Sequence, residues 1–333
     1  MNVAIIGYGY WGPNLVRNFS AVNNCTLKFV SDFREERLAL VTKAYPNVKV
    51  TTNPDDILLS PEVDAVVIAT PVFAHYTLAK KALENGKHVL IEKPMTATVK
   101  EAEELINLAT QKNLVLMVDH TFLYTGAIKK MKQLIDEKSI GDIQYFDSSR
   151  INLGLFQPDV NVLWDLAPHD ISILLYLIKG KPYSVNATGI SHTKNGIENI
   201  AYLTVNYTND FIAHFSCSWT SPVKLRTLLI GGDKKMLVFN DLEPSEKIKI
   251  YDTGYNYKTD EEKNRLLVDY RTGDVYIPKI EMKEALFGMA DDFVNSILNK
   301  TVPVSNAQLG LDVIKILEAS QLSIKNNGKE IIL

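Results

Sequence analysis

The first third of the chain alternates short apolar runs with amphipathic segments of helical length. Runs such as Val3–Ile6 are apolar at every position, which is typical of parallel strands buried on both faces. We expect strands at residues 3–6, 26–31, 48–51, 64–69, 88–92 and 114–119, and helices at 14–19, 34–44, 54–59, 74–85 and 99–111. Because strands and helices alternate with short connections, the pattern predicts an N-terminal Rossmann domain, residues 1–120, with a doubly wound parallel sheet.

The pattern changes after residue 120, where strands follow one another with few helices between them. Thr208-Asn209-Asp210 separates two strand-like runs and indicates a hairpin. We expect strands at residues 142–152, 201–207, 211–219, 225–231, 236–240 and 247–251, and helices at 126–137, 166–178, 283–299 and 306–325. The chain is therefore α/β overall. Its second half, residues 121–333, is predicted to be an α+β substrate-binding and oligomerisation domain with a large open, mainly antiparallel sheet.

One strand of that second sheet carries an aromatic stripe. Phe211, Phe215 and Trp219 share a face because side chains alternate along a strand with a period of two. We expect the stripe to be too extensive for the helices of one chain to cover. An exposed apolar sheet face favours self-association, so the sequence predicts a homodimer or homotetramer formed through the C-terminal sheet.

Composition excludes several classes of function. The 333 residues include 36 Lys and Arg against 39 Asp and Glu, so no global field favours nucleic acid or an anionic membrane. No apolar run approaches the ~20 residues of a membrane span, and no leader pattern precedes Val3. Cys25 and Cys217 lack CxxC spacing and are interpreted as thiols in a reducing compartment. We expect a cytoplasmic protein with a small-molecule substrate, no nucleic-acid partner and no membrane partner.

A glycine-rich motif directly follows the first strand. It reads Gly7-Tyr8-Gly9-Tyr10-Trp11-Gly12, which is GxGxxG inside a βαβ unit. The three glycines allow a tight turn, close backbone approach to a pyrophosphate and close packing of helix on strand. The free N–H groups of the following helix favour phosphate binding, so we expect a dinucleotide here, with Tyr10 and Trp11 beside it.

Asp32 ends the second strand, 20 residues after Gly12. A carboxylate at that place binds the ribose hydroxyls of the adenosine and repels a 2′-phosphate, which favours NAD over NADP. Arg34 is the counter-argument, because a neighbouring arginine can accept that phosphate. NAD is the expected cofactor, and NADP stays open.

Three further motifs carry a family resemblance. Ala69-Thr70-Pro71-Val72-Phe73-Ala74-His75 closes the fourth strand, Glu92-Lys93-Pro94 closes the fifth, and Trp164-Asp165-Leu166-Ala167-Pro168-His169-Asp170 opens a helix of the second domain. Together with the glycine loop they resemble the Gfo/Idh/MocA oxidoreductase family over nearly the whole chain. The resemblance implies a dehydrogenase that acts on a CH–OH group. It also implies cofactor contacts from Thr70, Pro71, His75, Glu92 and Lys93.

Alcohol oxidation needs a group that takes the hydroxyl proton as hydride leaves. Histidine suits that task because its pKa lies near neutrality. The resemblance makes His169 the general acid/base and Lys93 the residue that orients the hydroxyl and stabilises an alkoxide. Asp165, one helical turn before His169, is interpreted as orienting substrate or histidine, although by itself it also fits a helix N-cap. No cluster has metal-ligand spacing, so no metal is expected.

Substrate contacts are less strongly indicated. Residues 152–171 are similar to family members that act on nucleotide-linked sugars, oxidising C3 of UDP-N-acetylglucosamine or its uronic acid. Such a reaction belongs to amino-sugar or surface-polysaccharide biosynthesis. A diphosphate needs cations, and exposed cations are also often simply solvated. The candidate substrate neighbours are His120, Tyr124, Arg150, Asn152, Trp164, Lys224 and Arg226.

Three alternative functions stay open within the same fold. The first is an NADP-dependent 3-ketoreductase of deoxysugar biosynthesis, and the second is an inositol-type polyol dehydrogenase. The third is a non-catalytic dinucleotide-binding regulator. The joint presence of Lys93, Asp165 and His169 argues against the third.

Overall fold

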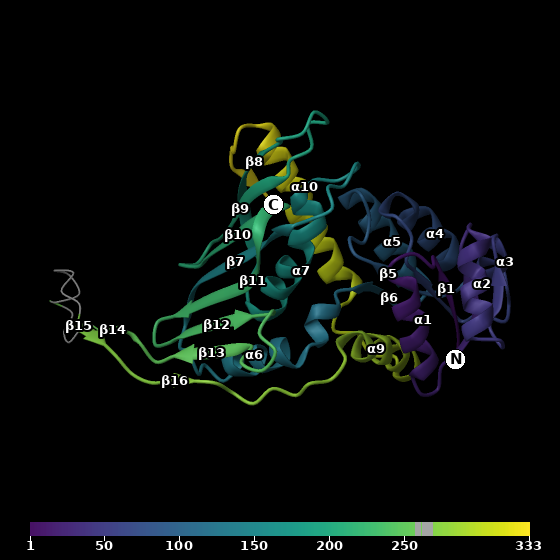
Figure 1. Cartoon of the computed structure of the whole chain (residues 1–333), viewed down its shortest axis with the longest axis horizontal. Coiled ribbons are helices and arrows are strands. Elements are labelled where there is room, and N and C mark those ends of the chain that lie inside the picture. The colour runs from purple at the N-terminus through teal and green to yellow at the C-terminus, as the bar shows by residue number, and fades with distance from the viewer. Residues whose placement is uncertain (257–260, 262–268) are drawn as a thin grey trace. The chain divides into compact units, whose positions relative to one another are not determined.

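A computed structural model describes residues 1–256, 261 and 269–333 of the chain (Figure 1). The chain forms two compact units. Unit 1 comprises Met1–Thr125 and Lys283–Glu318, and unit 2 comprises Gly126–Met282 and Ala319–Leu333. Among the described residues, no helix is both long and apolar enough to cross a membrane.

Unit 1 is built on a six-stranded parallel sheet of order β3-β2-β1-β4-β5-β6. The strands are β1 (Asn2–Ile6), β2 (Thr26–Ser31), β3 (Lys49–Thr51), β4 (Ala65–Ile68), β5 (His88–Glu92) and β6 (Leu116–Asp119). The helices that connect them are α1 (Gly12–Ala21), α2 (Glu35–Ala44), α3 (Asp55–Leu58), α4 (Val72–Glu84) and α5 (Val99–Gln111). This arrangement confirms the predicted doubly wound sheet. The strand order reverses between β1 and β4, which is where such sheets bind ligands.

A late segment of the chain also belongs to unit 1. It contains α9 (Ala285–Asn299) and the start of α10 (Ala307–Lys325). The helix α9 lies beside the short 3-10 helix η1 (Thr121–Tyr124), which comes much earlier in the sequence. Arg17 of α1 holds Glu284 with two hydrogen bonds of 2.9 and 2.5 Å, and Phe19 packs edge-on against Phe293. Unit 1 therefore includes a segment from the second half of the chain, because α9 buries its apolar face against α1.

Unit 2 contains a nine-stranded sheet of order β16-β13-β12-β11-β7-β10-β9-β8-β17. The strands are β7 (Ile143–Leu153), β8 (Pro182–Ile190), β9 (Ile200–Tyr207), β10 (Ile212–Ser218), β11 (Thr220–Gly232), β12 (Met236–Asn240), β13 (Ile248–Tyr251), β16 (Val275–Tyr276) and β17 (Ile331–Ile332). Every neighbouring pair is antiparallel except β7 with β10, which confirms the mainly antiparallel prediction. A separate ribbon pairs β14 (Gly254–Asn256) with β15 (Asp269–Arg271).

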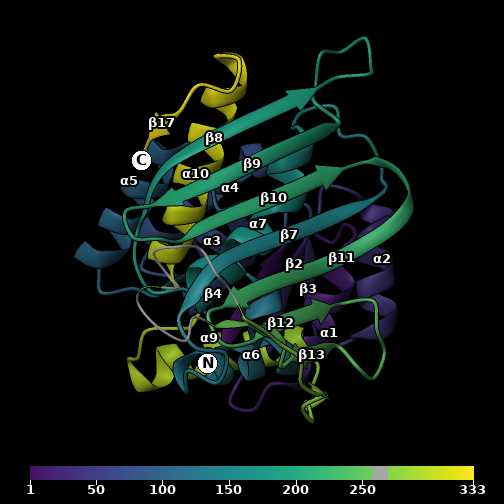
Figure 2. The same ribbon diagram turned by 90° about the vertical axis from the view of Figure 1, so that its left-hand side faces the viewer.

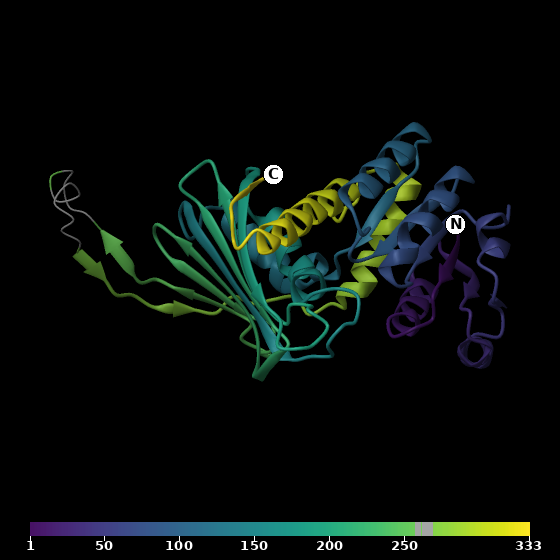
Figure 3. The ribbon, with the colours of Figure 1, turned by 90° about the horizontal axis from the view of Figure 1, so that it is seen from above.

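The two faces of this sheet differ. The helices α6 (Gly126–Asp136) and α7 (Val162–Leu177) lie behind the strands in Figure 2. Phe211, Phe215 and Trp219 face them and are almost completely buried, so the expectation that one chain leaves this stripe uncovered is wrong. The opposite face instead carries the alternate residues of the same strands, including Tyr202 and Ile212, which are half exposed. Figure 3 shows the strands of this sheet edge-on, with the helix α7 on one side of them. Alternation placed the aromatic residues on one face correctly but did not reveal that α7 covers it.

Candidate active site

The glycine loop between β1 and α1 is shaped for close backbone approach. Gly7 has φ +104°, and a Cβ there would lie 2.3 Å from the carbonyl oxygen of Ala69. A Cβ on Gly12 would lie 2.7 Å from the carbonyl oxygen of Gly7. Gly9 differs, because a Cβ there would meet only a guanidinium nitrogen at 3.8 Å. Gly7 and Gly12 thus close the turn, and Gly9 borders open space that a phosphate can approach.

Two exposed aromatic side chains flank this loop. Tyr10 and Trp11 pack edge to face with ring centroids 5.6 Å apart, and Tyr10 is 88% exposed. Both were predicted to lie beside the cofactor, and the structure places them on the glycine loop itself. Their exposure leaves apolar surface available to a bound ligand.

Asp32 lies at the end of β2 and is nearly buried. Its carboxylate accepts hydrogen bonds from the backbone N–H of Tyr8 at 2.8 Å and of Arg34 at 3.0 Å. The Arg34 guanidinium adds two more, from Nε at 2.9 Å and Nη2 at 3.0 Å. Burial alone would raise the pKa of Asp32, but these hydrogen bonds lower it, so the carboxylate stays ionised.

The loops that end β4 and β5 are joined through His75. One imidazole nitrogen of His75 lies 2.7 Å from the Thr70 carbonyl oxygen, and the other lies 2.9 Å from the Pro94 carbonyl oxygen. Burial lowers the pKa of His75, whereas the two carbonyl contacts act in the opposite direction. His75 therefore fixes the edge on which Thr70, Pro71 and Lys93 lie.

Polar atoms are buried at this edge without partners. The Thr70 hydroxyl and both ring nitrogens of His120 have no hydrogen-bond partner within the part of the chain that the structure describes. Buried polar atoms without a hydrogen-bond partner are rare in proteins, and a bound ligand that supplies the missing hydrogen bonds would explain them. The glycine cradle and these atoms belong to the same carboxyl edge of the sheet, so the residues present fit a dinucleotide.

Tyr124, a candidate substrate neighbour, lies in η1. Its hydroxyl donates to Asp292 at 2.6 Å and lies 3.1 Å from the Ser305 hydroxyl, inside unit 1. Burial and the neighbouring carboxylate raise the pKa of Tyr124 far above its usual value. The contacts make Tyr124 a residue that holds α9 and the start of α10 in unit 1.

In unit 2, α7 carries Asp165 and His169 one turn apart. The helix begins earlier than predicted, because the Asn161 side chain caps it by accepting from the Trp164 N–H at 3.1 Å. Asp165 therefore lies in the first turn rather than at the N-cap. The indole Nε1 of Trp219 donates to the Asp165 carboxylate at 3.0 Å.

Trp219 is the main positioning residue that the sequence did not reveal. It is buried, its ring lies 5.6 Å from that of Phe156, and its carbonyl oxygen accepts from the Gly154 N–H at 2.9 Å. A Cβ on Gly154 would approach the Trp219 ring to 2.6 Å, so only glycine fits there. Because 54 residues separate Trp219 from Asp165, no local pattern indicates their contact.

The candidate phosphate-binding cations of unit 2 have different surroundings. Arg150 is buried and donates to Asp170 from Nε at 2.8 Å and from Nη2 at 2.6 Å. Arg226 faces Asp241 at 3.4 Å, and Lys224 is exposed. The pairing with Asp170 assigns Arg150 to the interior, where it anchors α7 to β7. Asn152 and Trp164 are half-buried on β7 and α7.

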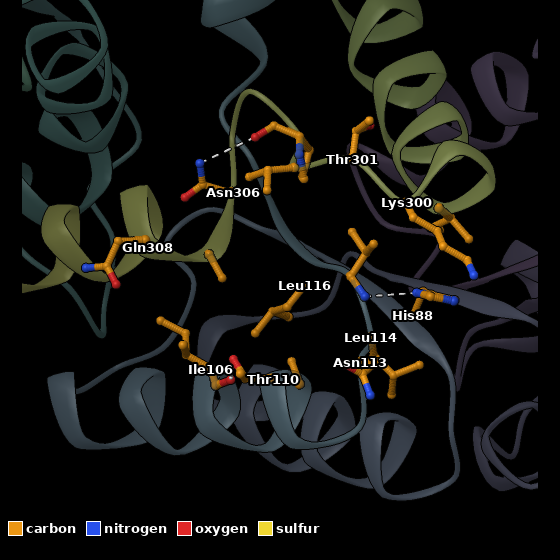
Figure 4. A pocket seen from close by; sticks show the side chains of 16 residues that line it. His88, Ile106, Thr110, Asn113, Leu114, Leu116, Lys300, Thr301, Asn306 and Gln308 are labelled. Carbon is orange, nitrogen blue, oxygen red and sulfur yellow. Dashed lines mark hydrogen bonds between the residues drawn. The ribbon is translucent and has the colours of Figure 1, made fainter.

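A cavity of about 850 Å³ in unit 1 lies elsewhere (Figure 4). It is lined by His88 at the start of β5, by Leu116 at the start of β6, and by Lys300 and Asn306. The Val115 N–H donates to His88 Nδ1 at 2.9 Å. These residues lie at the amino edge of the sheet, so this cavity is separate from the glycine loop.

No group of three or more histidine, cysteine, aspartate or glutamate side chains in the described ranges is arranged to hold a metal ion. The fold, the glycine cradle and Asp32 define a dinucleotide-binding protein of the Rossmann class. Residues 1–120 match the oxidoreductase family with an NAD-binding Rossmann fold, and residues 128–238 match the Gfo/Idh/MocA C-terminal domain. The chain belongs to the Gfo/Idh/MocA oxidoreductase family.

Its relatives include sugar and polyol dehydrogenases. UDP-N-acetylglucosamine 3-dehydrogenase of Acidithiobacillus ferrooxidans is 33% identical over 66% of this chain and 67% of that protein. The scyllo-inositol 2-dehydrogenase (NADP(+)) IolW of Bacillus subtilis is 29% identical over 62% of this chain and 60% of that protein. A solved structure of UDP-N-acetylglucosamine 3-dehydrogenase GnnA from A. ferrooxidans has a TM-score of 0.81 and 25% identity, covering 99% of both chains.

The buried pair of Arg150 and Asp170 predicts a large stability effect. Asp170→Asn removes one charge and leaves the Arg150 guanidinium buried without its counter-charge, which costs about 3–5 kcal/mol. We expect that loss in urea unfolding followed through the fluorescence of Trp164 and Trp219. Asp136→Asn, which breaks an exposed pair on α6, is the matched control and leaves the unfolding midpoint nearly unchanged. Equal midpoints for the two variants would contradict the anchoring role of Arg150.

Proposed function

We propose that this protein is an NAD-dependent oxidoreductase that moves hydride between a sugar hydroxyl and nicotinamide. The proposed substrate is UDP-N-acetylglucosamine or its uronic acid, oxidised at C3. The observation that carries the proposal is the hydrogen bond from Trp219 to Asp165, one turn before His169 on α7. A carboxylate fixed in this way can orient substrate or histidine for proton transfer. The relative from A. ferrooxidans supports the choice of sugar.

The residues that hold the dinucleotide follow from the carboxyl edge of unit 1. The glycine loop would hold the pyrophosphate, Asp32 the adenosine ribose, and the edge at Thr70 and Lys93 the nicotinamide. When bound, this group would supply the hydride acceptor. His75 lies within hydrogen-bond distance of both loops of this edge and keeps them together.

The protein's own chemistry is a proton transfer. His169 takes the proton of the sugar hydroxyl on an imidazole nitrogen as the C3–H bond breaks and the carbonyl bond forms. The Lys93 ammonium stabilises the negative charge that develops on the oxygen. Asp165 orients the reacting groups and is itself held by Trp219. Lys93 belongs to unit 1, and Asp165 and His169 belong to unit 2.

The contacts of Asp32 support NAD over NADP. Four hydrogen bonds converge on its carboxylate, and Arg34 supplies three of them. An arginine engaged in this way is less available to a 2′-phosphate, and the ionised carboxylate repels that phosphate. The free thiols of Cys25 and Cys217 fit a reducing compartment, so we place the reaction in the cytoplasm.

A polyol dehydrogenase is the second candidate. The similarity to scyllo-inositol 2-dehydrogenase favours it, because the same proton and hydride transfers apply to any secondary alcohol. A substrate panel separates the two, since only a nucleotide sugar carries a diphosphate.

We also propose that the protein self-associates through the uncovered face of the unit 2 sheet. Tyr145, Tyr202 and Ile212 lie exposed on that face, which α6 and α7 leave bare. Burial of this face against a second copy predicts a dimer or tetramer in light scattering. Ile212→Lys should lower the mass towards that of a monomer, whereas Leu59→Lys, an exposed leucine in unit 1, should not. A monomeric wild-type protein at micromolar concentration would rule this interface out.

The substrate panel tests the proposed function. UDP-N-acetylglucosamine, its uronic acid, scyllo-inositol, myo-inositol and glucose are each incubated with enzyme and NAD or NADP, and reduced cofactor is followed by absorbance. We expect turnover with a UDP sugar and NAD, and a lower kcat/KM with NADP. His169→Asn should lower kcat by about 10²–10⁴-fold with little change in substrate binding, because a general base contributes that factor.

The outcomes of the panel are distinct. Turnover confined to an inositol would assign the polyol function and overturn the nucleotide-sugar proposal. Equal kcat for His169→Asn and wild type would remove His169 from the mechanism. Tight NAD binding without turnover of any substrate would contradict the enzymatic assignment.

A further inference from the structure

Two acidic side chains meet at the carboxyl edge of unit 1. Glu92 ends β5 and Asp119 ends β6, and the two residues are direct partners in the parallel ladder. Directly paired residues on neighbouring strands point to the same face of a sheet, with the strands about 4.8 Å apart. The ladder therefore brings two carboxyl groups together beside Lys93, the residue that follows Glu92.

The strand register sets these two carboxyl groups side by side. An ionised carboxylate only accepts hydrogen bonds, so two ionised carboxylates cannot hydrogen-bond to each other. A proton on one of the two groups allows them to do so. Two like charges held at this distance in a buried place would also repel strongly, as in other carboxyl pairs that share a proton.

The surrounding donors indicate which group carries the proton. Asp119 accepts from the Thr121 hydroxyl and from the Thr121 backbone N–H, and these contacts favour its ionised form. Glu92 accepts a longer hydrogen bond, 3.2 Å, from the Lys93 backbone N–H. Burial raises the pKa of both groups, and the charge of Asp119 raises the pKa of Glu92 further, well above its usual value. The donors and the burial both favour a protonated Glu92 and an ionised Asp119.

The other titratable groups at this edge complete the charge balance. The Lys93 ammonium acts on both carboxyl groups and favours their ionised forms. His120 follows Asp119, and burial together with Lys93 lowers its pKa to about 3, so the ring is neutral. One ammonium and one shared negative charge cancel, whereas two carboxylates would leave an excess buried charge that is costly.

We propose that Glu92 and Asp119 share a single proton, held on Glu92, and that this singly charged pair positions Lys93 and supplies its counter-charge. The role of Lys93 in hydride transfer rests on the proposed function, but the shared proton does not. In this arrangement Glu92 donates to Asp119 and accepts from the Lys93 backbone N–H, and the pair carries one negative charge beside Lys93. Glu92 and Asp119 are positioning residues, because they act through Lys93.

Infrared spectroscopy of the protein without substrate or cofactor tests the shared proton. At neutral pH the wild-type protein should show the C=O stretch of a protonated buried carboxyl group, which shifts in D₂O. Glu92→Gln removes the protonated group, and Asp119→Asn lets Glu92 ionise, so each variant should lose the band. Glu103→Gln, the same change at an exposed position on α5, should keep it. A wild-type spectrum without this band would overturn the proposal, whatever the substrate panel shows.

Discussion

The common carboxyl edge of the parallel strands in unit 1 is the constraint on which the site depends. Parallel strands all end on the same side of a sheet, so the residues after β1, β2, β4, β5 and β6 collect there whatever their distance in sequence. The glycine loop can approach a ligand only because Gly7 and Gly12 leave no room for a side chain. The same edge places Glu92 and Asp119 side by side, and their closeness is the basis of the proposed shared proton.

In unit 2, two contacts fix the position of α7. The bidentate pair of Arg150 and Asp170 joins α7 to β7, and the Trp219 indole holds Asp165 at the start of the same helix. A buried ion pair adds little net stability over apolar residues, but it is costly to break, so it specifies one placement of the helix. His169 lies between these two attachments along α7, which suits the proton transfer proposed for it.

Sequence reasoning predicted the elements better than their partners. Apolar runs located the central strands of unit 1, such as β1 and β4, because these parallel strands are buried on both faces and need no long-range information. The edge strand β3 is short and largely exposed. The start of α7 was predicted too late, because Asp165 by itself fits a helix N-cap and Asn161 was not recognised as the cap. Motifs indicated Lys93, Asp165 and His169 as candidates. Trp219, Asp119 and the Asp170 partner of Arg150 were not, because each acts through a contact that only the folded chain makes.

Deuterium transfer is the most direct test of the central claim, that hydride leaves C3 of a nucleotide sugar for the nicotinamide. UDP-N-acetylglucosamine carrying deuterium at C3 is incubated with the enzyme and NAD, and the reduced cofactor is analysed by mass spectrometry and NMR. The account predicts one deuterium at C4 of the nicotinamide and a slower reaction than with unlabelled sugar. Reduced cofactor without deuterium would show that another position is oxidised, and no reduced cofactor would contradict the account.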